Sequence, residues 1–481
     1  MSPQGETRSY SNILSQVPAE WSDSPLLRRS IAETQRGRNK KIIVLDDDPT
    51  GVQTMHDIYV LTDWSIELLR QAFERPDPLF YILTNTRAYQ PGVAERINRT
   101  IAQSVDEISR VTGIEYVFIS RSDSTLRGYY PLEIDALSNE IFRLTERTFD
   151  GHLIIPAFFE GCRITFGNTH FIRESDSLVP VNETEFSNDK VFGYTHGDLT
   201  RWVEEKTHGK VKATDCICIS VNDIRQGPDA VEKILLCASG NVPVIVNCLS
   251  YADLDVLSSA LLHVEEKGMK FIYRTAASFV KSYGGVESID SLPWYRLVTN
   301  FHQHGGLIIV GSHVQKTTRQ LENLIRDTNV VTLEMNVNRI LNSDERLHEL
   351  NQLTTEVNRR LSQGDNVVVF SSRKLVAVDN EIDNLNISQT VSASLVHIVQ
   401  SLQVTPKFII AKGGITSSDV ATKGLGIRVA RVIGQATAGV PVWLTGPEAK
   451  FTGIPYIVFP GNVGAESTLS EVVQKIEGPH S

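Results

Sequence analysis

Short apolar runs alternate with amphipathic segments along nearly all of this 481-residue chain, and this alternation constrains the fold more than any other feature. The segment 93–113, for example, carries apolar residues three or four positions apart, as an amphipathic helix does. In the first half of the chain the apolar runs occupy 41–46, 79–86, 116–122, 152–158, 215–221 and 243–249. Strands that alternate with helices in this way predict a parallel sheet with helices on both faces.

A second series of apolar runs follows, at 306–313, 329–335, 366–372, 407–414, 439–446 and 455–462. A chain of this length is longer than the chains that fold around a single hydrophobic core. We therefore predict an α/β fold with two domains, 39–295 and 306–478, each a mostly parallel sheet flanked by helices, with the active site in the cleft between them. Residues 1–38 are mostly polar and predict an N-terminal arm with one amphipathic stretch.

The composition excludes several classes of protein. A net charge of −10 argues against a general nucleic-acid binder and against a protein of anionic membrane surfaces. No apolar run approaches the roughly 20 residues that span a bilayer, and the polar start of the chain lacks the apolar segment of a secretory signal. Five dispersed cysteines fit reduced thiols better than a disulfide framework. We expect a cytoplasmic protein, and the sequence leaves open whether it forms a homodimer.

The apolar run at 42–45 ends in three consecutive carboxylates, Asp46, Asp47 and Asp48, followed by a Pro-Thr-Gly turn. Adjacent aspartates repel one another, so they need a cation, hydrogen-bond donors or a proton nearby. In open α/β sheets, ligands bind at the carboxyl ends of the strands. The structural alternative is an Asp-rich turn that caps a helix.

Three more apolar runs of the first half end in groups that can bind an anion. Arginine forks match the two oxygens of a small carboxylate, and hydroxyl groups beside them suit a polyol. In a parallel sheet these strand ends lie at the same edge as the aspartates, although each one alone is equally well explained as a solvated turn. The candidate residues are Arg87, Arg121, Ser122, Asp123, Ser124, Arg127, Gly128, Arg163, Thr165 and His170.

The second half instead places glycines after its strands. A glycine-rich turn that leads into a helix offers free backbone N–H groups to a phosphate. The candidates for nucleotide binding are Ser312, Gly413, Gly414, Ile415, Thr416, Gly461 and Asn462. No Walker A sequence occurs, nor does G-x-G-x-x-G follow a strand. Ordinary helix capping and tight turns are the alternative explanation.

A domain that binds a carboxylated polyol and a domain that binds a nucleotide together predict phosphoryl transfer. This reaction needs positioning, exclusion of water, a base for the attacking hydroxyl and cations on the transferred group. Asp47, Asp48 or Asp123 could act as the base, or hold Mg²⁺ through water. We expect ATP and Mg²⁺ as cofactors, and the metal ligands stay unassigned.

The chain resembles the four-carbon acid sugar kinase family from about residue 41 to 478. The matching stretches are DDDPTGVQ (46–53), LTNTRA (83–88), SRSDSTLRG (120–128), IPAFFEGCRIT (155–165), TEFSNDKVFGY (184–194), VGSHV (310–314), KGGITSSD (412–419), GVPVW (439–443) and FPGNVG (459–464). The resemblance implies an alcohol-group phosphotransferase that uses ATP on threonate, erythronate or a 3-oxo-tetronate.

The resemblance also implies roles for particular residues. The acid sugar would be bound by Asp47, Asp48, Arg87, Asp123, Ser124, Arg127 and Gly128. Of the possible bases, we expect Asp123 and Asp47 to be the catalytic residues. ATP would be bound by Ser312, the 413–416 turn and Gly461. Two positions depart from the family pattern: many members have a hydrophobic residue where Pro49 stands, and often Lys where Arg121 stands. These departures leave the identity of the acid open.

Two other interpretations compete with the kinase. Asp46 and Asp48, spaced two apart after a buried strand, also fit the first motif of haloacid-dehalogenase-like phosphatases, with Asp46 as nucleophile. That motif requires a later lysine and paired acids, where this chain has glycines and arginines. A non-enzymatic interaction protein or effector is the third interpretation. The scarcity of disordered sequence counts against it.

Overall fold

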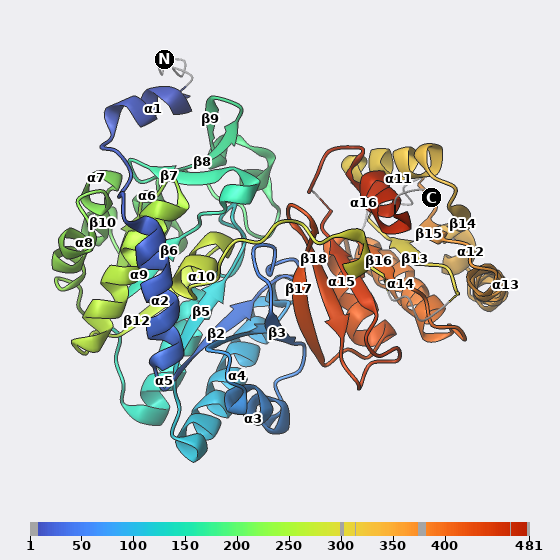
Figure 1. Cartoon of the computed structure of the whole chain (residues 1–481), viewed down its shortest axis with the longest axis horizontal. Helices are drawn as coiled ribbons and strands as arrows, with labels where there is room; N and C mark the ends of the chain where they lie inside the picture. The colour runs from blue at the N-terminus through green and yellow to red at the C-terminus, as the bar shows by residue number, and fades with distance from the viewer. Residues whose placement is uncertain (1–7, 299–302, 313, 374–380, 462, 479–481) are drawn as a thin grey trace. The chain divides into compact units, whose positions relative to one another are not determined.

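The structure of the chain is a computed structural model, and it describes residues 8–298, 303–312, 314–373, 381–461 and 463–478. The chain divides into two compact units (Figure 1). The first unit comprises Met1–Gly51 and Trp64–Ser288, and the second comprises Val52–Asp63 and Ile289–Ser481. None of the helices in the described part of the chain is long and apolar enough to cross a membrane.

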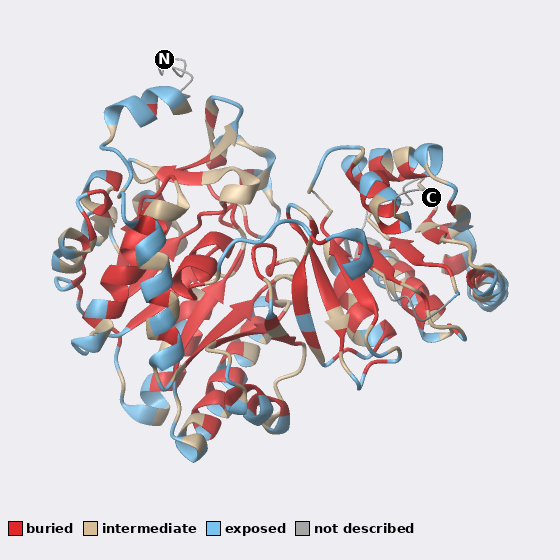
Figure 2. Cartoon of the chain, in the orientation of Figure 1, coloured by how far each residue is buried: buried red, intermediate tan, exposed pale blue. Residues whose placement is uncertain are grey.

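The first unit contains a parallel sheet in the order β10-β11-β6-β12-β5-β2-β4. Its strands are β2 (Lys40–Asp46), β4 (Leu79–Leu83), β5 (Glu115–Arg121), β6 (Gly151–Ile155), β10 (Ile217–Ile219), β11 (Val242–Val246) and β12 (Phe271–Thr275). The apolar residues 42–45 of β2 are buried, as Figure 2 shows for most strands of the sheet. Burial on both faces explains why these strands read as continuous apolar runs.

Helices pack on this sheet in two groups. One group is α3 (Ile66–Glu74), α4 (Pro91–Thr112) and α5 (Leu132–Thr145). The other group is α2 (Ser24–Gly37), α8 (Pro228–Leu235), α9 (Tyr251–Glu266) and α10 (Ala277–Tyr283). The amphipathic stretch expected in the N-terminal arm is α2, which packs along α9.

A small antiparallel sheet, in the order β1-β9-β8-β7, also belongs to the first unit. Its strands are β1 (Arg8–Ser9), β7 (Arg163–Phe166), β8 (Thr169–Glu174) and β9 (Ser177–Pro180). Gly167 and Asn168 both have positive φ, as the two-residue turn between antiparallel strands requires. Thr165 and His170 therefore lie in strands and not in loops after a strand.

The second unit contains a mixed sheet in the order β3-β17-β18-β19-β16-β13-β15-β14. The five strands from β19 to β14 are parallel, and β3, β17 and β18 add antiparallel pairs. The strands are β3 (Ile58–Leu61), β13 (Leu307–Val310), β14 (Val331–Met335), β15 (Val367–Ser371), β16 (Ile409–Lys412), β17 (Val429–Thr437), β18 (Val440–Thr445) and β19 (Pro455–Phe459). The helices include α11 (Gln315–Asp327), α13 (Ser343–Ser362), α14 (Glu381–Gln400), α15 (Gly414–Asp419) and α16 (Thr468–Glu477).

The predicted fold class, two α/β domains with mostly parallel sheets, is confirmed. Each of the twelve predicted apolar runs contains a strand, whereas β3, β12, β17 and the small sheet were not predicted. The segment Val52–Asp63 lies in the second unit, although the predicted first domain of 39–295 included it, because β3 pairs with β17. The limits of 306–478 and the cleft between the domains stay predictions.

Candidate functional site

The aspartate turn follows β2 at the carboxyl edge of the parallel sheet. Asp46 and Asp47 are each 2% exposed. Asp46 accepts hydrogen bonds from Arg121 Nη1 and from the Asp48 N–H, both at 3.3 Å. Burial raises the pKa of Asp46 to about 8, against the opposing charge of Arg121. A carboxyl group with this pKa is mostly protonated at neutral pH.

Arg87 connects three carboxylates. Its Nε lies 3.2 Å from Asp47 Oδ1, its Nη2 lies 2.7 Å from Asp48 Oδ2, and its Nη1 lies 3.5 Å from Asp123 Oδ1. Asn85 has a left-handed backbone with φ of 52°, which turns the chain after β4 and leads into the short helix that carries Arg87. Burial alone would lower the pKa of Arg87, but Asp47 and Asp48 raise it, so this side chain stays a cation.

The loop after β5 supplies Ser122 and Asp123 to the same place. Ser122 Oγ donates to Asp47 Oδ2 at 2.8 Å. Asp123 accepts from Arg127 Nε at 2.8 Å. Burial would raise the pKa of Asp123, but Arg87 and Arg127 hold it well below its usual range. Asp123 is therefore a carboxylate with two cationic partners.

Asp47 differs from Asp123 in its surroundings. Burial raises the pKa of Asp47 above its usual range, against the charge of Arg87. Its Oδ1 is buried and accepts no well-directed hydrogen bond, although Arg87 Nε is 3.2 Å away. Oδ2 of the same carboxylate accepts from Ser122, so the group is held in place while Oδ1 stays unsatisfied. Such an acceptor suits a ligand hydroxyl group.

Thr165 and His170 are both fully buried behind the Asp123 loop. Thr165 Oγ1 lies 2.9 Å from His170 Nδ1, and His170 Nε2 lies 2.8 Å from the Ser124 carbonyl oxygen. Because a carbonyl only accepts, Nε2 carries the proton and Nδ1 accepts from Thr165. Burial lowers the pKa of His170 to about 4, so the ring is neutral. The two residues hold the loop backbone at Ser124.

Two residues of this site were not predicted from the sequence. Arg274, near the end of β12, is 3% exposed and donates from Nη2 to the Arg127 carbonyl at 3.1 Å. Glu133, in α5, is 3% exposed and accepts from Thr86 Oγ1 at 2.6 Å. Burial, with the charge of Asp47, raises the pKa of Glu133 to about 7. Arg274 Nε and Glu133 Oε2 are buried without hydrogen-bond partners. An apolar run that ends in Arg-Thr was the available signal for Arg274, whereas Glu133 reads as an ordinary helix position.

The site of the first unit is thus a buried set of guanidinium and carboxylate groups with unsatisfied donors and acceptors among them. Gly128 lies in its centre: a Cβ there would meet Asp47 Oδ2 at 3.1 Å and Arg274 Nη2 at 3.4 Å, and its φ is 113°. Among the described residues, no group of three or more His, Cys, Asp or Glu side chains is arranged to hold a metal ion. The arrangement suits a small polar anion with hydroxyl groups better than a bare cation.

The predicted nucleotide residues of the second unit follow the neighbouring parallel strands β13, β16 and β19. A Cβ on Gly413 would meet Ser312 Cβ at 3.0 Å, and one on Gly461 would lie 3.9 Å from Ser312 Oγ. Gly413 has φ of 115°, a conformation that favours glycine. Gly414, Ile415 and Thr416 form the start of α15. The structure therefore brings the predicted loops together, while Asn462 lies outside the described residues.

Lys412 joins two of these loops and was not predicted as a site residue. It is the last residue of β16, fully buried, and its Nζ donates to the carbonyl oxygens of Pro460 at 2.5 Å and Gly461 at 3.2 Å. Burial, with the nearby charge of Lys316, lowers the pKa of Lys412 to about 7. The side chain fixes the turn after β19 against the end of β16.

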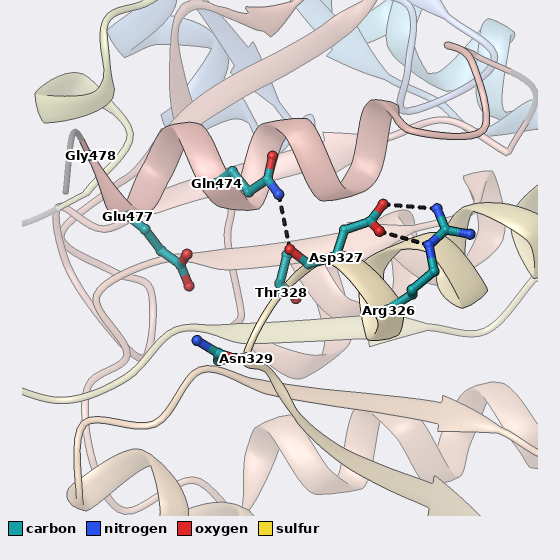
Figure 3. A pocket seen from close by; sticks show the side chains of 7 residues that line it. All are labelled: Arg326, Asp327, Thr328, Asn329, Gln474, Glu477 and Gly478. Carbon is teal, nitrogen blue, oxygen red and sulfur yellow. Dashed lines mark hydrogen bonds and ion pairs between the residues drawn. The ribbon is translucent and has the colours of Figure 1, made fainter.

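A separate pocket of about 460 Å³ lies in the second unit where α11 and α16 end (Figure 3). Its charged side chains are largely neutralised, since Arg326 and Asp327 pair with each other at 2.7 Å. Gln474 donates to the Asp327 carbonyl at 3.0 Å. The pocket contains none of the predicted site residues, and we assign it no function. It is lined by Arg326, Asp327, Thr328, Asn329, Gln474, Glu477 and Gly478.

Comparisons with known proteins agree with this division of the chain. A sugar-binding N-terminal domain matches residues 42–283, and a nucleotide-binding C-terminal domain matches residues 307–469. No curated protein matches the sequence at a significant level.

Solved structures show the same fold. A Salmonella typhimurium LT2 protein, provisionally described as a tRNA synthase, is 18% identical over 91% of this chain and 99% of its own, with a TM-score of 0.67. A Haemophilus influenzae protein of family DUF1537 is 17% identical over 90% of this chain and 99% of its own, with a TM-score of 0.60. Since the sugar-binding and nucleotide-binding family domains match in order along most of its length, the chain belongs to the four-carbon acid sugar kinase family.

Proposed function

We propose that this protein is an ATP-dependent kinase that phosphorylates a hydroxyl group of a four-carbon sugar acid of the threonate, erythronate or 3-oxo-tetronate type. The observation that carries the proposal is the Arg87 guanidinium, which contacts Asp47, Asp48 and Asp123 at the carboxyl edge of the sheet. This cluster lies in the region that matches a sugar-binding domain. A four-carbon acid is small enough for one such cluster to contact its carboxylate and its hydroxyl groups.

Guanidinium groups are proposed to bind the carboxylate of the acid. A carboxylate pairs with a guanidinium through two parallel hydrogen bonds, which fixes its orientation. Arg127 is about one quarter exposed and Arg274 keeps a free Nε, so both can offer donors. Asp47 and Asp48 then accept hydrogen bonds from the hydroxyl groups. Arg121, Ser122, Ser124 and Gly128 complete the proposed acid site, with Thr165 and His170 supporting its loop.

Asp47 fits the role of general base better than Asp123 does. A base needs a free oxygen and a pKa near the working pH. Asp47 Oδ1 lacks a directed hydrogen bond and the pKa of Asp47 is raised by burial, whereas two arginines hold the pKa of Asp123 down. In the proposed step, Asp47 accepts the proton of a substrate hydroxyl group while the oxygen of that hydroxyl group bonds to the γ-phosphorus. The bond from that phosphorus to the bridging oxygen breaks, and ADP leaves.

The loops of the second unit are proposed to hold ATP. Ser312, Gly413, Gly414, Ile415, Thr416 and Gly461 offer backbone N–H and hydroxyl donors at adjoining strand ends, and Asn462 is proposed to join them. Mg²⁺ would neutralise part of the phosphate charge when bound. Because Arg87 already pairs with three of the carboxylates, we propose that the ion arrives on the nucleotide.

The phosphatase alternative is weaker on the same geometry. A nucleophilic aspartate must be ionised, whereas burial raises the pKa of Asp46 to about 8. Gly51 also packs against the Asp46 carboxyl group, since a Cβ there would lie 1.9 Å from Oδ2. Release of phosphate from a phosphorylated four-carbon acid without nucleotide would favour this alternative.

A coupled assay for ADP release tests the proposal directly. The substrates are both enantiomers of threonate, both enantiomers of erythronate and their 3-oxo forms, each with and without Mg²⁺. We expect one acid or a related pair to stimulate ADP release far above the rate with ATP alone. If no acid stimulates release and ADP does not bind, the protein is better explained as an interaction protein.

A further inference from the structure

The N-terminal segment 8–17 packs on the part of the first unit that supports the acid site. It contains β1 and α1 (Tyr10–Gln16), and it precedes residue 42, where the match to the sugar-binding domain begins. Figure 1 shows α1 beside β8 and β9, at the small antiparallel sheet. This sheet carries Thr165 and His170.

Polar contacts attach the segment to the open edge of the small sheet. β1 pairs with β9, with Arg8 opposite Leu178 and Ser9 opposite Ser177. The turn before β9 is held as well, because Asp176 Oδ1 accepts from the Ser11 N–H at 2.8 Å and Asp176 Oδ2 accepts from Ser9 Oγ at 2.5 Å. At the opposite edge, Thr165 in β7 forms an antiparallel bridge to Cys248, just after β11. The small sheet is therefore held between the main sheet and the N-terminal segment.

Apolar packing attaches the segment to one face of the same sheet. Ile13 in α1 is 5% exposed and belongs to a buried cluster with Ile164, Phe171, Leu178 and Leu249. Ile164 pairs with Phe171, and the next pair is Thr165 with His170. Successive side chains of a strand point to opposite faces. Ile13 thus packs on the face opposite to the one that presents Thr165 and His170.

The contacts continue from that second face to the acid site. His170 Nε2 donates to the Ser124 carbonyl at 2.8 Å, and Ser124 adjoins Asp123, the partner of Arg87 and Arg127. We propose that residues 8–17 are a positioning segment, which holds the small sheet in place and thereby fixes the Asp123 loop for binding of the sugar acid. This inference rests on the proposed function, and it gives the segment a supporting role in binding of the sugar acid.

The effect of the segment is expected to be partial, because the loop has a second support. Tyr194 Oη donates to the Thr125 carbonyl at 2.8 Å, a contact that involves no residue of the segment 8–17. Small displacements of binding groups still reduce the rate of reaction substantially. A several-fold loss in acid binding is therefore the expected scale.

Kinetics of Ile13→Ala test the inference, with Leu14→Ala as the matched control. Leu14 lies on the same helix and is 40% exposed. Ile13→Ala should raise KM for the acid roughly three- to tenfold and change KM for ATP by less than about twofold, whereas Leu14→Ala should change neither. Asp176→Ala, which removes the polar contacts without touching the core, should act in the same direction. Equal changes in both KM values, or an unchanged KM for the acid in both variants, would overturn the inference.

Hydrogen exchange provides a readout that does not depend on activity. In Ile13→Ala, amides of 163–180 and of 120–126 should exchange faster than in the unmodified protein, while those of 307–371 should not change. Faster exchange confined to 163–180 would overturn the positioning role even if the protein proved to be a kinase. The expected pattern in a protein that phosphorylates no acid would refute the proposed function and leave the mechanical coupling intact.

Discussion

Asp47 and Asp123 are both contacted by Arg87, yet their surroundings give them different chemistry. The pKa of Asp123 is held down by Arg87 and Arg127, whereas burial raises the pKa of Asp47 and one of its oxygens is left without a directed hydrogen bond. Two carboxylates whose environments shift their pKa values in opposite directions are typical of sites that separate the base from a binding group.

Asp47→Asn should therefore lower kcat by roughly 10²- to 10⁴-fold, the usual contribution of a general base. The amide cannot accept the proton but keeps the size of the side chain, so KM for the acid should change only a few-fold. Asp123→Asn is the matched comparison, and we expect it mainly to raise KM for the acid because Arg87 and Arg127 lose a partner. Steady-state kinetics of both variants would contradict this assignment if Asp123→Asn abolished kcat and Asp47→Asn did not.

Lys412 should make the stability of the protein depend on pH. Its pKa in the folded chain is lowered to about 7, from 10.5 for an ordinary lysine. Between these values the unfolded chain holds a proton that the folded chain has released, so the free energy of unfolding rises with pH. Lys412→Met removes this dependence. The melting temperature of the unmodified protein should therefore rise relative to that of the variant from about pH 7 to about pH 10.5, and parallel pH profiles would refute the assignment.

At the level of secondary structure, the aspartate turn after β2 depends on the close packing of Gly51 against the Asp46 carboxyl group. A Cβ on Gly51 would lie 1.9 Å from Asp46 Oδ2 and 2.2 Å from its Cγ, so Gly51→Ala must displace the carboxyl group or the turn. We expect a loss of about 1–3 kcal/mol in the free energy of unfolding, together with weaker acid binding.

Gly92→Ala is the control for this substitution. Gly92 lies in the first turn of α4, and a Cβ there would meet no atom within 4 Å. Alanine should be neutral or stabilise the helix by about 0.5–1 kcal/mol. Denaturant unfolding of the two variants would contradict the account if Gly51→Ala were as stable as Gly92→Ala.

Most strands that the sequence predicts are buried on both faces, although β10 and β14 are only partly buried and the fully buried β12 was missed. Ile42–Leu45 and Leu307–Val310, for example, are continuous apolar runs because helices or side chains cover both sides of them. β3 escaped prediction because it has only four residues, and β17 because polar residues interrupt it, as exposed Arg431 does. The hairpin at Gly167-Asn168 had a turn signal of its own, but the flanking strands are short and mixed in polarity.

The candidate acid site was predictable only in part, because only some of its residues directly follow an apolar run. Asp47, Arg87 and Asp123 follow apolar runs, so the parallel sheet brings them to one edge. Arg274 and Glu133 come from a strand and a helix that carry no motif, and only the three-dimensional fold places them near Asp47. Thr165 and His170 were expected at the substrate, but their burial and their contacts with Ser124 suit a supporting role.

At the scale of the whole molecule, the second unit is not continuous in sequence. β3 supplies residues 58–61 to the edge of its sheet, where it pairs with Val429–Val432 of β17. Asp63 also pairs with Arg428 at 2.6 Å. A chain that begins at Ile289 would lack these contacts and would leave β17 as an open edge.

We therefore predict that a fragment of residues 289–481 is destabilised and prone to associate, and that a peptide of residues 52–63 raises its melting temperature. A peptide of the same composition in scrambled order should have no effect, since strand pairing requires the register of Ile58 to Leu61. Calorimetry with both peptides measures the difference. Equal stability of the fragment with and without the native peptide would contradict the role of β3.

Phosphoryl transfer to the acid can be tested by following the transferred phosphate itself. Phosphorus NMR of the protein with ATP, Mg²⁺ and each four-carbon acid in turn should show a new phosphomonoester signal that grows in equal amount with ADP. The signal should need both ATP and one particular acid, and Asp47→Asn should prevent it. Formation of ADP and free phosphate at the same rate with or without any acid, or no ADP with any of them, would contradict the account.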